Sequence, residues 1–313
     1  MIFAGIDEAG YGPRLGPLVV AANALRFGGT PAGEGWPQCR FLCGPGPVMV
    51  CDSKAAYSSA KGIGALERVV LAFAARAGGC PSTVAAFFER FVVDGATETL
   101  SRPWYACAAR TLPQEIEAKE ASDLSARVGE TLAAEGYEWL GAQLAVVDET
   151  RFNEILERTG NKAVLLFGRN SILMRRLWDA YGRETIYLTA DRHGGRKFYA
   201  GLLDIAFPEA RINILYEDDD DSAYRLEDDE GRVMFVRFKV RSEEVDSAAA
   251  LSSMWAKYTR EILMRAFNDY WLSKADGLVR TAGYWVDAER FIADLLAAGV
   301  VTPAQASEFT RWK

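Results

Sequence analysis

The chain has 313 residues, of which 50% are hydrophobic and 25% carry a charge. This balance is typical of a globular protein with enough apolar side chains to form a core, and it excludes disorder of the whole chain. The net charge of −7 argues at first sight against a nucleic-acid partner, because phosphate binding favours a basic surface. Nine of the acids lie in two short runs, however, at residues 217–221 and 227–230, and without them the net charge is +2. The composition is therefore compatible with a basic surface outside these two runs.

No apolar stretch approaches the roughly 20 residues that a membrane helix needs, and the N-terminus lacks the basic segment that opens a secretion signal. We therefore expect a cytoplasmic, monomeric protein that makes no contact with a membrane. The cysteines are odd in number and scattered, which predicts free thiols. They are Cys39, Cys43, Cys51, Cys80 and Cys107. A zinc site at Cys39 and Cys43 is disfavoured, because there is no second cysteine pair and His193 is the only histidine.

Hydrophobic periodicity predicts strands and helices in alternation along the first half of the chain. The predicted strands are residues 1–7, 18–25 and 137–147. The predicted helices are the Ala-rich segments 62–77 and 113–135. A Gly- and Pro-rich loop at 10–17 joins the first two strands tightly.

The second half continues in the same manner and ends in helices. Its predicted helices are residues 149–158, 171–181, 246–270 and 287–298, and its predicted strands are 185–190, 212–216, 223–226 and 232–240, the last two forming a hairpin. These elements predict an α/β protein with a mixed β-sheet flanked by helices. We expect a catalytic core over residues 1–260, with a helical insert at about 62–136, and a helical C-terminal extension over 261–313.

Two adjacent carboxylates, Asp7 and Glu8, end the first predicted strand. An ionised carboxylate in an apolar setting is costly unless a cation accompanies it, so a divalent metal ion is a natural partner. The glycines that follow do not have the spacing of a dinucleotide-binding loop, and a strand follows them where that loop would have a helix. They would instead let a bulky ligand such as a nucleic-acid strand approach the backbone. Further acids at Asp191 and at 243–246 could complete a two-metal site of oxygen ligands, or could be ordinary solvated residues.

Residues 5–17 closely resemble the signature that opens ribonuclease HII sequences, in which the Asp and the Glu bind metal. Three further blocks are similar in the same order: Asp-Ser-Lys at 52–54, the Ser- and Ala-rich helix at 252–261, and Gly-Tyr at 283–284. The resemblance implies a ribonuclease H-like core. It also implies that Tyr284 packs on the sugar beside a ribonucleotide.

The resemblance implies two further metal ligands. Asp191 falls where the family has its third acid, and Glu243 lies ten residues before Ser253, where the family has an Asp. Asp246 is the alternative fourth ligand, although its position immediately before a helix also suits an N-cap. The family's Gly-Arg-Gly triplet, which recognises the 2′-OH, reads Gly10-Tyr11-Gly12 here, so selectivity for the RNA–DNA junction is open.

The sequence thus predicts an endonuclease that uses Mg²⁺ or Mn²⁺, two ions during turnover, to cleave the RNA strand or embedded ribonucleotides of an RNA/DNA hybrid or a ribonucleotide-containing duplex. The predicted metal-binding and catalytic residues are Asp7, Glu8, Asp191 and Glu243. The predicted substrate-binding residues are Gly10, Tyr11, Gly12, Lys54, Ser253, Lys257 and Tyr284. His193 is interpreted as a turn residue, with proton transfer as its alternative role. Two other functions stay open: a nucleic-acid-binding protein of the same fold without turnover, and a two-metal nuclease acting on structured DNA. Ribonuclease HIII, which usually has an additional N-terminal domain, is the less favoured relative.

Overall fold

The computed structural model describes residues 1–29, 36–42, 46, 48–50 and 62–312. Its centre is one mixed sheet of eight strands in the order β3-β4-β2-β1-β5-β8-β7-β6. The strands are β1 (Ile2–Ala9), β2 (Leu18–Phe27), β3 (Val92–Asp94), β4 (Tyr137–Val147), β5 (Ile186–Asp191), β6 (Ala210–Glu217), β7 (Asp221–Asp228) and β8 (Val233–Lys239). The Lys54 prediction lies outside the described residues.

The register of the central strands decides where their ends meet. Strand β1 pairs antiparallel with β2 and parallel with β5, with Ile6 opposite Ala190, and β5 pairs parallel with β8. The carboxyl ends of these parallel strands therefore reach the same edge of the sheet. As predicted from its apolar sequence, β1 is buried over Ile2–Asp7, because helices cover both faces of the sheet at this point.

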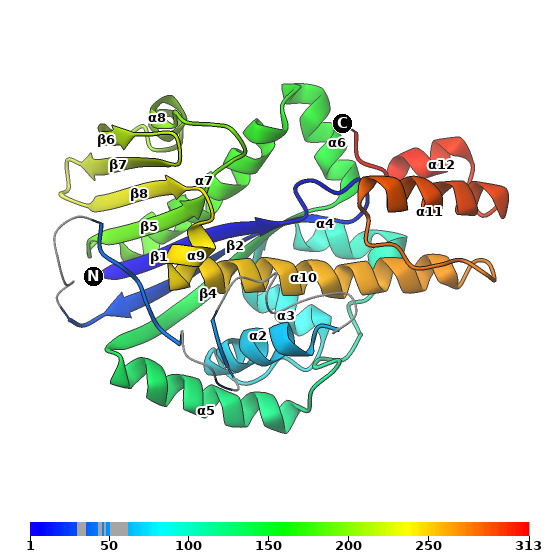
Figure 1. Ribbon diagram of the computed structural model, residues 1–313, viewed down its shortest axis with the longest axis horizontal. Coiled ribbons are helices and arrows are strands. Elements are labelled where there is room, and N and C mark those ends of the chain that lie inside the picture. The colour runs from blue at the N-terminus through cyan, green and yellow to red at the C-terminus, as the bar shows by residue number, and fades with distance from the viewer. Residues whose placement is uncertain (30–35, 43–45, 47, 51–61, 313) are drawn as a thin grey trace.

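Helices pack on both faces of the sheet (Figure 1). They are α2 (Gly64–Arg76), α3 (Val84–Phe91), α4 (Ala96–Ser101), α5 (Ala118–Ala134), α6 (Glu149–Thr159), α7 (Lys162–Tyr181), α8 (Ala200–Ala206), α9 (Ser242–Val245), α10 (Ser247–Leu272), α11 (Trp285–Ala297) and α12 (Pro303–Glu308). One core lies between the sheet and α2, α3, α5 and α10, and a second lies between its other face and α6, α7 and α8. The predicted α/β class, with a mixed sheet, a helical insert and a helical extension, is confirmed.

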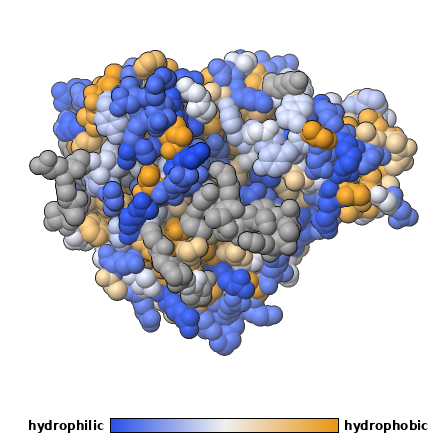
Figure 2. Space-filling model, in the orientation of Figure 1, coloured by the Kyte–Doolittle hydropathy of each residue, from blue (hydrophilic) through white to orange (hydrophobic). Residues whose placement is uncertain are grey.

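The extension projects from the rest of the molecule as α11 and α12 (Figure 1). Figure 2 shows hydrophobic side chains gathered on the surface of this projection. The exposed ones include Trp285, Val286, Leu296 and Trp312. Among the described residues, no helix is long and apolar enough to cross a membrane.

The long helix α10 lies directly on β1. A Cβ atom built on Gly5 would come within 2.1 Å of the main chain of Ala248, so only a glycine permits this approach. Ser252 Oγ donates a hydrogen bond to the Gly5 carbonyl at 2.8 Å, and Asn23 Nδ2 donates to the same hydroxyl at 3.2 Å. These contacts fix the N-terminal half of α10 and the short helix α9 over the carboxyl edge of the sheet.

The sequence does not predict the short elements β3, α8, α9 and α12, and the structure differs from the predicted elements in two further respects. The insert contains four helices, where the sequence predicts two, because α3 and α4 are short and lie in segments of irregular pattern. Helix α7 begins at Lys162 and not at residue 171, because the side chain of Asn161 caps it there by accepting a hydrogen bond from the Ala163 backbone at 2.8 Å. Among the described cysteines, Cys80 and Cys107 are free, as predicted, and Cys39 is a thiol that interacts with Tyr137. Cys43 and Cys51 lie outside the described residues.

Candidate metal centre

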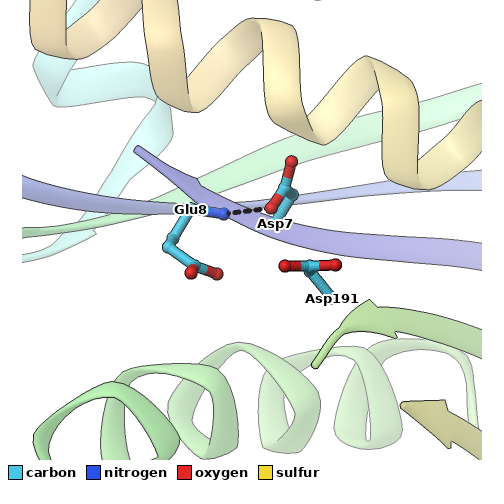
Figure 3. A group of neighbouring side chains, drawn as sticks. All are labelled: Asp7, Glu8 and Asp191. Carbon is cyan, nitrogen blue, oxygen red and sulfur yellow. Dashed lines mark hydrogen bonds between the residues drawn. The ribbon is translucent and has the colours of Figure 1, made fainter. Parts of the chain in front are cut away.

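Three carboxylates meet at the carboxyl edge of the sheet (Figure 3). Asp7 and Glu8 are near the end of β1, Asp191 is the last residue of β5, and one oxygen of each lies within 4.8 Å of the other two. Asp7 is only 7% exposed, whereas Glu8 and Asp191 are half-buried. The parallel pairing of β1 with β5 brings these residues together across about 180 positions of sequence, as the difference between their numbers shows.

The electrostatics of this cluster centre on Asp7. Its pKa is raised to about 8, first by burial and then by the negative charges of Asp191 and Glu243. Hydrogen bonds from Ser253 and from the Glu8 backbone, the latter 2.7 Å long, oppose the rise. Without a metal ion the folded protein therefore keeps a proton on Asp7 at neutral pH, and a divalent cation there would favour the ionised form. The oxygen donors fit Mg²⁺ or Mn²⁺, which prefer carboxylates.

Glu243 and Asp246, the two alternatives for a fourth ligand, make different contacts in the structure. Glu243 is 9% exposed in α9, and its charge acts on Asp7. Asp246 caps α10: its carboxylate accepts hydrogen bonds from the backbone of Ala248 and Ala249 at 2.9 and 3.0 Å and from Thr189 Oγ1 at 3.2 Å. Burial raises the pKa of Asp246 to about 6, against these bonds. The geometry places Asp246 in the capping role and leaves Glu243 beside the acid cluster.

Helix α10 supplies two further residues of the predicted site. Ser253 donates its side-chain hydrogen bond to Asp7. Lys257, one turn further along, forms an ion pair with Glu261 at 2.9 Å and is 18% exposed. The Ser- and Ala-rich start of α10 thus provides one contact to the acid cluster and a cation on the following turn.

The other predicted substrate-binding residues surround this edge. Tyr284 is the N-cap of α11 and is 55% exposed. Gly10 has a φ of +86° and is packed against Arg260, whereas a Cβ on Gly12 would meet no described atom within 4 Å. Tyr11 is half-buried, and its pKa is raised by burial and by Glu8. The loop therefore combines a tightly packed first glycine with an open second one.

Neither the family models nor the curated proteins contain a match to this sequence. The solved structures to which the chain is similar are ribonucleases HII and HIII. They include RNase HII of Archaeoglobus fulgidus, solved with PCNA, at 13% identity and a TM-score of 0.44, covering 100% of this chain and 96% of that one. Ribonuclease H2 from Pyrococcus horikoshii OT3 is 13% identical with a TM-score of 0.42, covering 100% and 94%. Bst-RNase HIII in complex with Mn²⁺ is 16% identical with a TM-score of 0.43, covering 99% and 66%.

These ribonucleases are the proteins that the sequence motifs predicted. Identity this low and TM-scores below 0.5 carry no argument about activity or about the role of any residue. The chemistry of this chain therefore rests on the arrangement of its own side chains.

His193 follows Asp191 by two residues but is not placed like a proton donor. It is 3% exposed, and its ring packs against Phe167, Tyr199 and Phe238. Burial lowers the pKa of His193 to about 3, so the imidazole is neutral at physiological pH. Its neutral ring can still form hydrogen bonds with a bound group.

A buried arginine near the end of the chain holds the 10–17 loop, and no sequence pattern indicates this role. Arg311 is 2% exposed and donates hydrogen bonds to the carbonyl oxygens of Gly10, Pro13 and Gly16. Its positive charge acts on buried Glu149. The loop beside Asp7 and Glu8 is therefore fixed by a residue some 300 positions away in the sequence.

Two other elements complete the support of this loop. Glu149 accepts hydrogen bonds from the Gly16 backbone at 2.8 Å and from Tyr105 at 2.7 Å. Arg260 on α10 donates to the Leu15 carbonyl at 3.3 Å. Such contacts between distant segments have no local sequence pattern, which is why only the folded structure reveals them.

Proposed function

We propose that this protein is a metal-dependent endonuclease of the ribonuclease H type 2 kind, which hydrolyses the RNA strand or an embedded ribonucleotide of an RNA/DNA duplex. The observation that supports this most directly is the meeting of Asp7, Glu8 and Asp191 at one edge of a mixed sheet, with the charge of Glu243 acting on Asp7. A buried carboxylate with a strongly raised pKa beside other acids is typical of a cation site.

The four acids Asp7, Glu8, Asp191 and Glu243 would hold the metal. Bound Mg²⁺ or Mn²⁺ would supply Lewis acidity for the phosphodiester and its attacking water. Ser253 orients Asp7 through its hydrogen bond.

The substrate would lie across the loop and the start of α11. The open face at Gly12 admits a nucleic-acid backbone, and the exposed ring of Tyr284 offers a surface for a sugar. Tyr11 would contribute its ring where the related motif has an arginine. We expect Lys257 to stabilise phosphate or acid charge from α10. Lys54 keeps its predicted phosphate-binding role as a part of this proposal.

The test is cleavage of a duplex that bears one ribonucleotide in one DNA strand, with Mg²⁺ or Mn²⁺ added. Wild type should cut on the 5′ side of the ribonucleotide and leave a 3′-hydroxyl. Asp7→Asn should lose about two orders of magnitude or more in rate, because removing one catalytic electrostatic contact commonly costs that much. Asp246→Asn is the matched control, since it alters an equally buried acid that caps a helix. Equal cleavage by wild type and Asp7→Asn would refute the proposal.

One observation favours a second candidate, a nucleic-acid-binding protein with weak or no turnover. The group of acids within 4.8 Å comprises Asp7, Glu8 and Asp191, and Glu243 stands outside it among the described residues. This candidate predicts salt-dependent binding of the same duplex without cutting. An all-DNA junction included in the same assay would reveal the third alternative, a nuclease for structured DNA.

A further inference from the structure

A pocket adjoins the acid cluster on the side of the loop that follows β5. It has a volume of about 580 Å³ and is lined by Tyr11, His193, Arg196, Lys197 and Phe198, among others. Sites of roughly 300 to 1,000 Å³ accept small ligands, and a nucleotide falls within this range. Its walls follow both acid-bearing strands, since Tyr11 lies three residues after Glu8 and His193 two residues after Asp191. The pocket thus lies beside the two loops that leave the acid-bearing strands.

Tyr11 connects the two sites. Its pKa is raised first by burial and then by the charge of Glu8, and it is lowered by the charge of Arg196, so the phenol lies within electrostatic reach of both. Arg196 also places its guanidinium 6.0 Å from the centre of the Tyr199 ring. The cation of Arg196 and the ring of Tyr11 therefore lie near Glu8. A ligand that carries both an anionic group and a flat ring could contact the two side chains together.

The loop is held by residues that do not line the pocket. Arg192, 7% exposed, donates a hydrogen bond of 2.6 Å to the carbonyl oxygen of Arg196. Tyr199 accepts a hydrogen bond of 3.0 Å from the His193 backbone, and its ring stacks on Phe238 with 3.6 Å between ring centres. These contacts fix the backbone of the loop. The side chains that line the pocket are therefore not needed to hold the loop and can contact a ligand.

Several polar atoms of these side chains lack partners. Both ring nitrogens of His193 and Nε of Arg196 are buried and have no hydrogen-bond partner among the described residues. Buried polar groups are nearly always paired in folded proteins, so such atoms point to water or a ligand. Lys197 pairs with Asp219, but Asp219 is 86% exposed and this surface pair is easily exchanged for another anion.

Phe198 is an exposed residue of the pocket, at 67%. An exposed aromatic ring beside cations is typical of surfaces on which nucleic-acid bases stack. We propose that this pocket binds a nucleotide of the substrate next to the scissile phosphate, with its base on Phe198 and its phosphate at Arg196 and Lys197. This inference rests on the proposed function for the identity of the substrate. Stacking of this kind tolerates every base, so the subsite would contribute affinity without sequence preference.

The experiment measures nucleotide binding separately from cleavage. The full chain is titrated in EDTA with a nucleoside 5′-monophosphate and, separately, with inorganic phosphate, and binding is followed by NMR. We expect wild type to bind the nucleotide more tightly than phosphate alone. Phe198→Ala should weaken nucleotide binding about 5- to 150-fold, the range that loss of one stacked base gives, and should leave phosphate binding unchanged. Ile205→Ala, which removes a side chain that is 79% exposed outside the pocket, is the control.

A second measurement concerns the duplex with the embedded ribonucleotide. Arg196→Gln should reduce the dependence of log Kd on log salt by about one, the effect of losing one phosphate contact. Arg183→Gln, an exposed arginine outside the pocket, should leave it unchanged. In the cleavage assay, Phe198→Ala should raise KM and leave kcat within about twofold, because it removes binding shared by ground and transition states.

The two proposals fail in different ways. Nucleotide binding that is equal in Phe198→Ala and Ile205→Ala, together with an unchanged KM, would overturn the subsite even if the protein cleaves its substrate. Absence of cleavage, with nucleotide binding that depends on Phe198, would overturn the nuclease and keep the pocket as a nucleotide site.

Discussion

Removal of the Asp7 charge should stabilise the metal-free protein, although it should abolish metal binding. Asp7 has a folded-state pKa of about 8 against 3.8 for an unperturbed carboxyl. The folded protein therefore holds a proton on Asp7 over a range in which the unfolded chain has released it. The free energy of unfolding of the wild-type protein is therefore highest, as far as Asp7 decides it, below about pH 4. This contribution is lost as the pH rises through about 8. Asp7→Asn does not ionise and escapes this loss.

The magnitude follows from the same pKa values. Each tenfold change in an ionisation constant is worth about 1.4 kcal/mol, so at pH 7 ionisation-linked destabilisation has a ceiling of about 4 kcal/mol. Solvent reaches the half-buried Asp191 and screens part of its repulsion of Asp7, and we expect about half of the ceiling, roughly 2 kcal/mol. Because Asn can still accept the hydrogen bonds from Ser253 and the Glu8 backbone, the substitution removes charge with little change in shape.

The assay is urea unfolding in EDTA at several values between pH 5 and pH 9. The free energy of unfolding of Asp7→Asn should exceed that of wild type by an amount that grows with pH. Addition of Mn²⁺ should then stabilise wild type, by about 2.7 kcal/mol at a hundredfold excess over Kd, and leave the variant unchanged. Parallel pH profiles for the two proteins would refute the reasoning, because they would show that Asp7 ionises normally in the fold.

Three other predictions concern the support of the site. Arg311→Met should lower the free energy of unfolding in urea by about 3–5 kcal/mol, since it leaves buried Glu149 and three carbonyl groups without their partner. A loss below about 1 kcal/mol would show that the 10–17 loop is stable without Arg311. Glu243→Gln should weaken Mn²⁺ binding about tenfold or more by calorimetry, whereas Asp246→Asn should leave it within about threefold; the reverse order would exchange the roles of the two acids. Gly5→Ala should cost about 3 kcal/mol or more because of its contact with α10, while Gly12→Ala, with open space around it, should change thermal stability little.

The fourth acid illustrates where sequence reasoning ends. Counting back from Ser253 selects Glu243, and the position before a helix equally suits Asp246 as ligand or as cap. In the structure the backbone N–H groups of α10 donate to the Asp246 carboxylate, which supports Glu243 as the proposed ligand. A cap and a ligand have the same sequence signature, so only the contacts distinguish the two roles.

The basic groups illustrate a different limit. Arg192 and Arg196 are arginines of the same short segment, and the sequence does not distinguish them. In the structure Arg192 is buried and holds the loop, whereas Arg196 lines the pocket. The pocket itself could not be predicted, because it forms between residues that follow two different strands. His193 was predicted as a turn residue, and its buried ring with unpartnered nitrogens is visible only in the fold.

The sequence by itself determined the α/β class, the two strands around the Gly- and Pro-rich loop, and the Asp7–Glu8 pair, because hydrophobic periodicity and adjacent residues are local properties. Only the tertiary structure decided the rest of the site. Parallel pairing of β1 with β5 brings Asp191 to the pair, and α10 brings Ser253. Arg311 reaches the loop because the end of the chain folds back onto it, a contact between distant residues that no local pattern encodes.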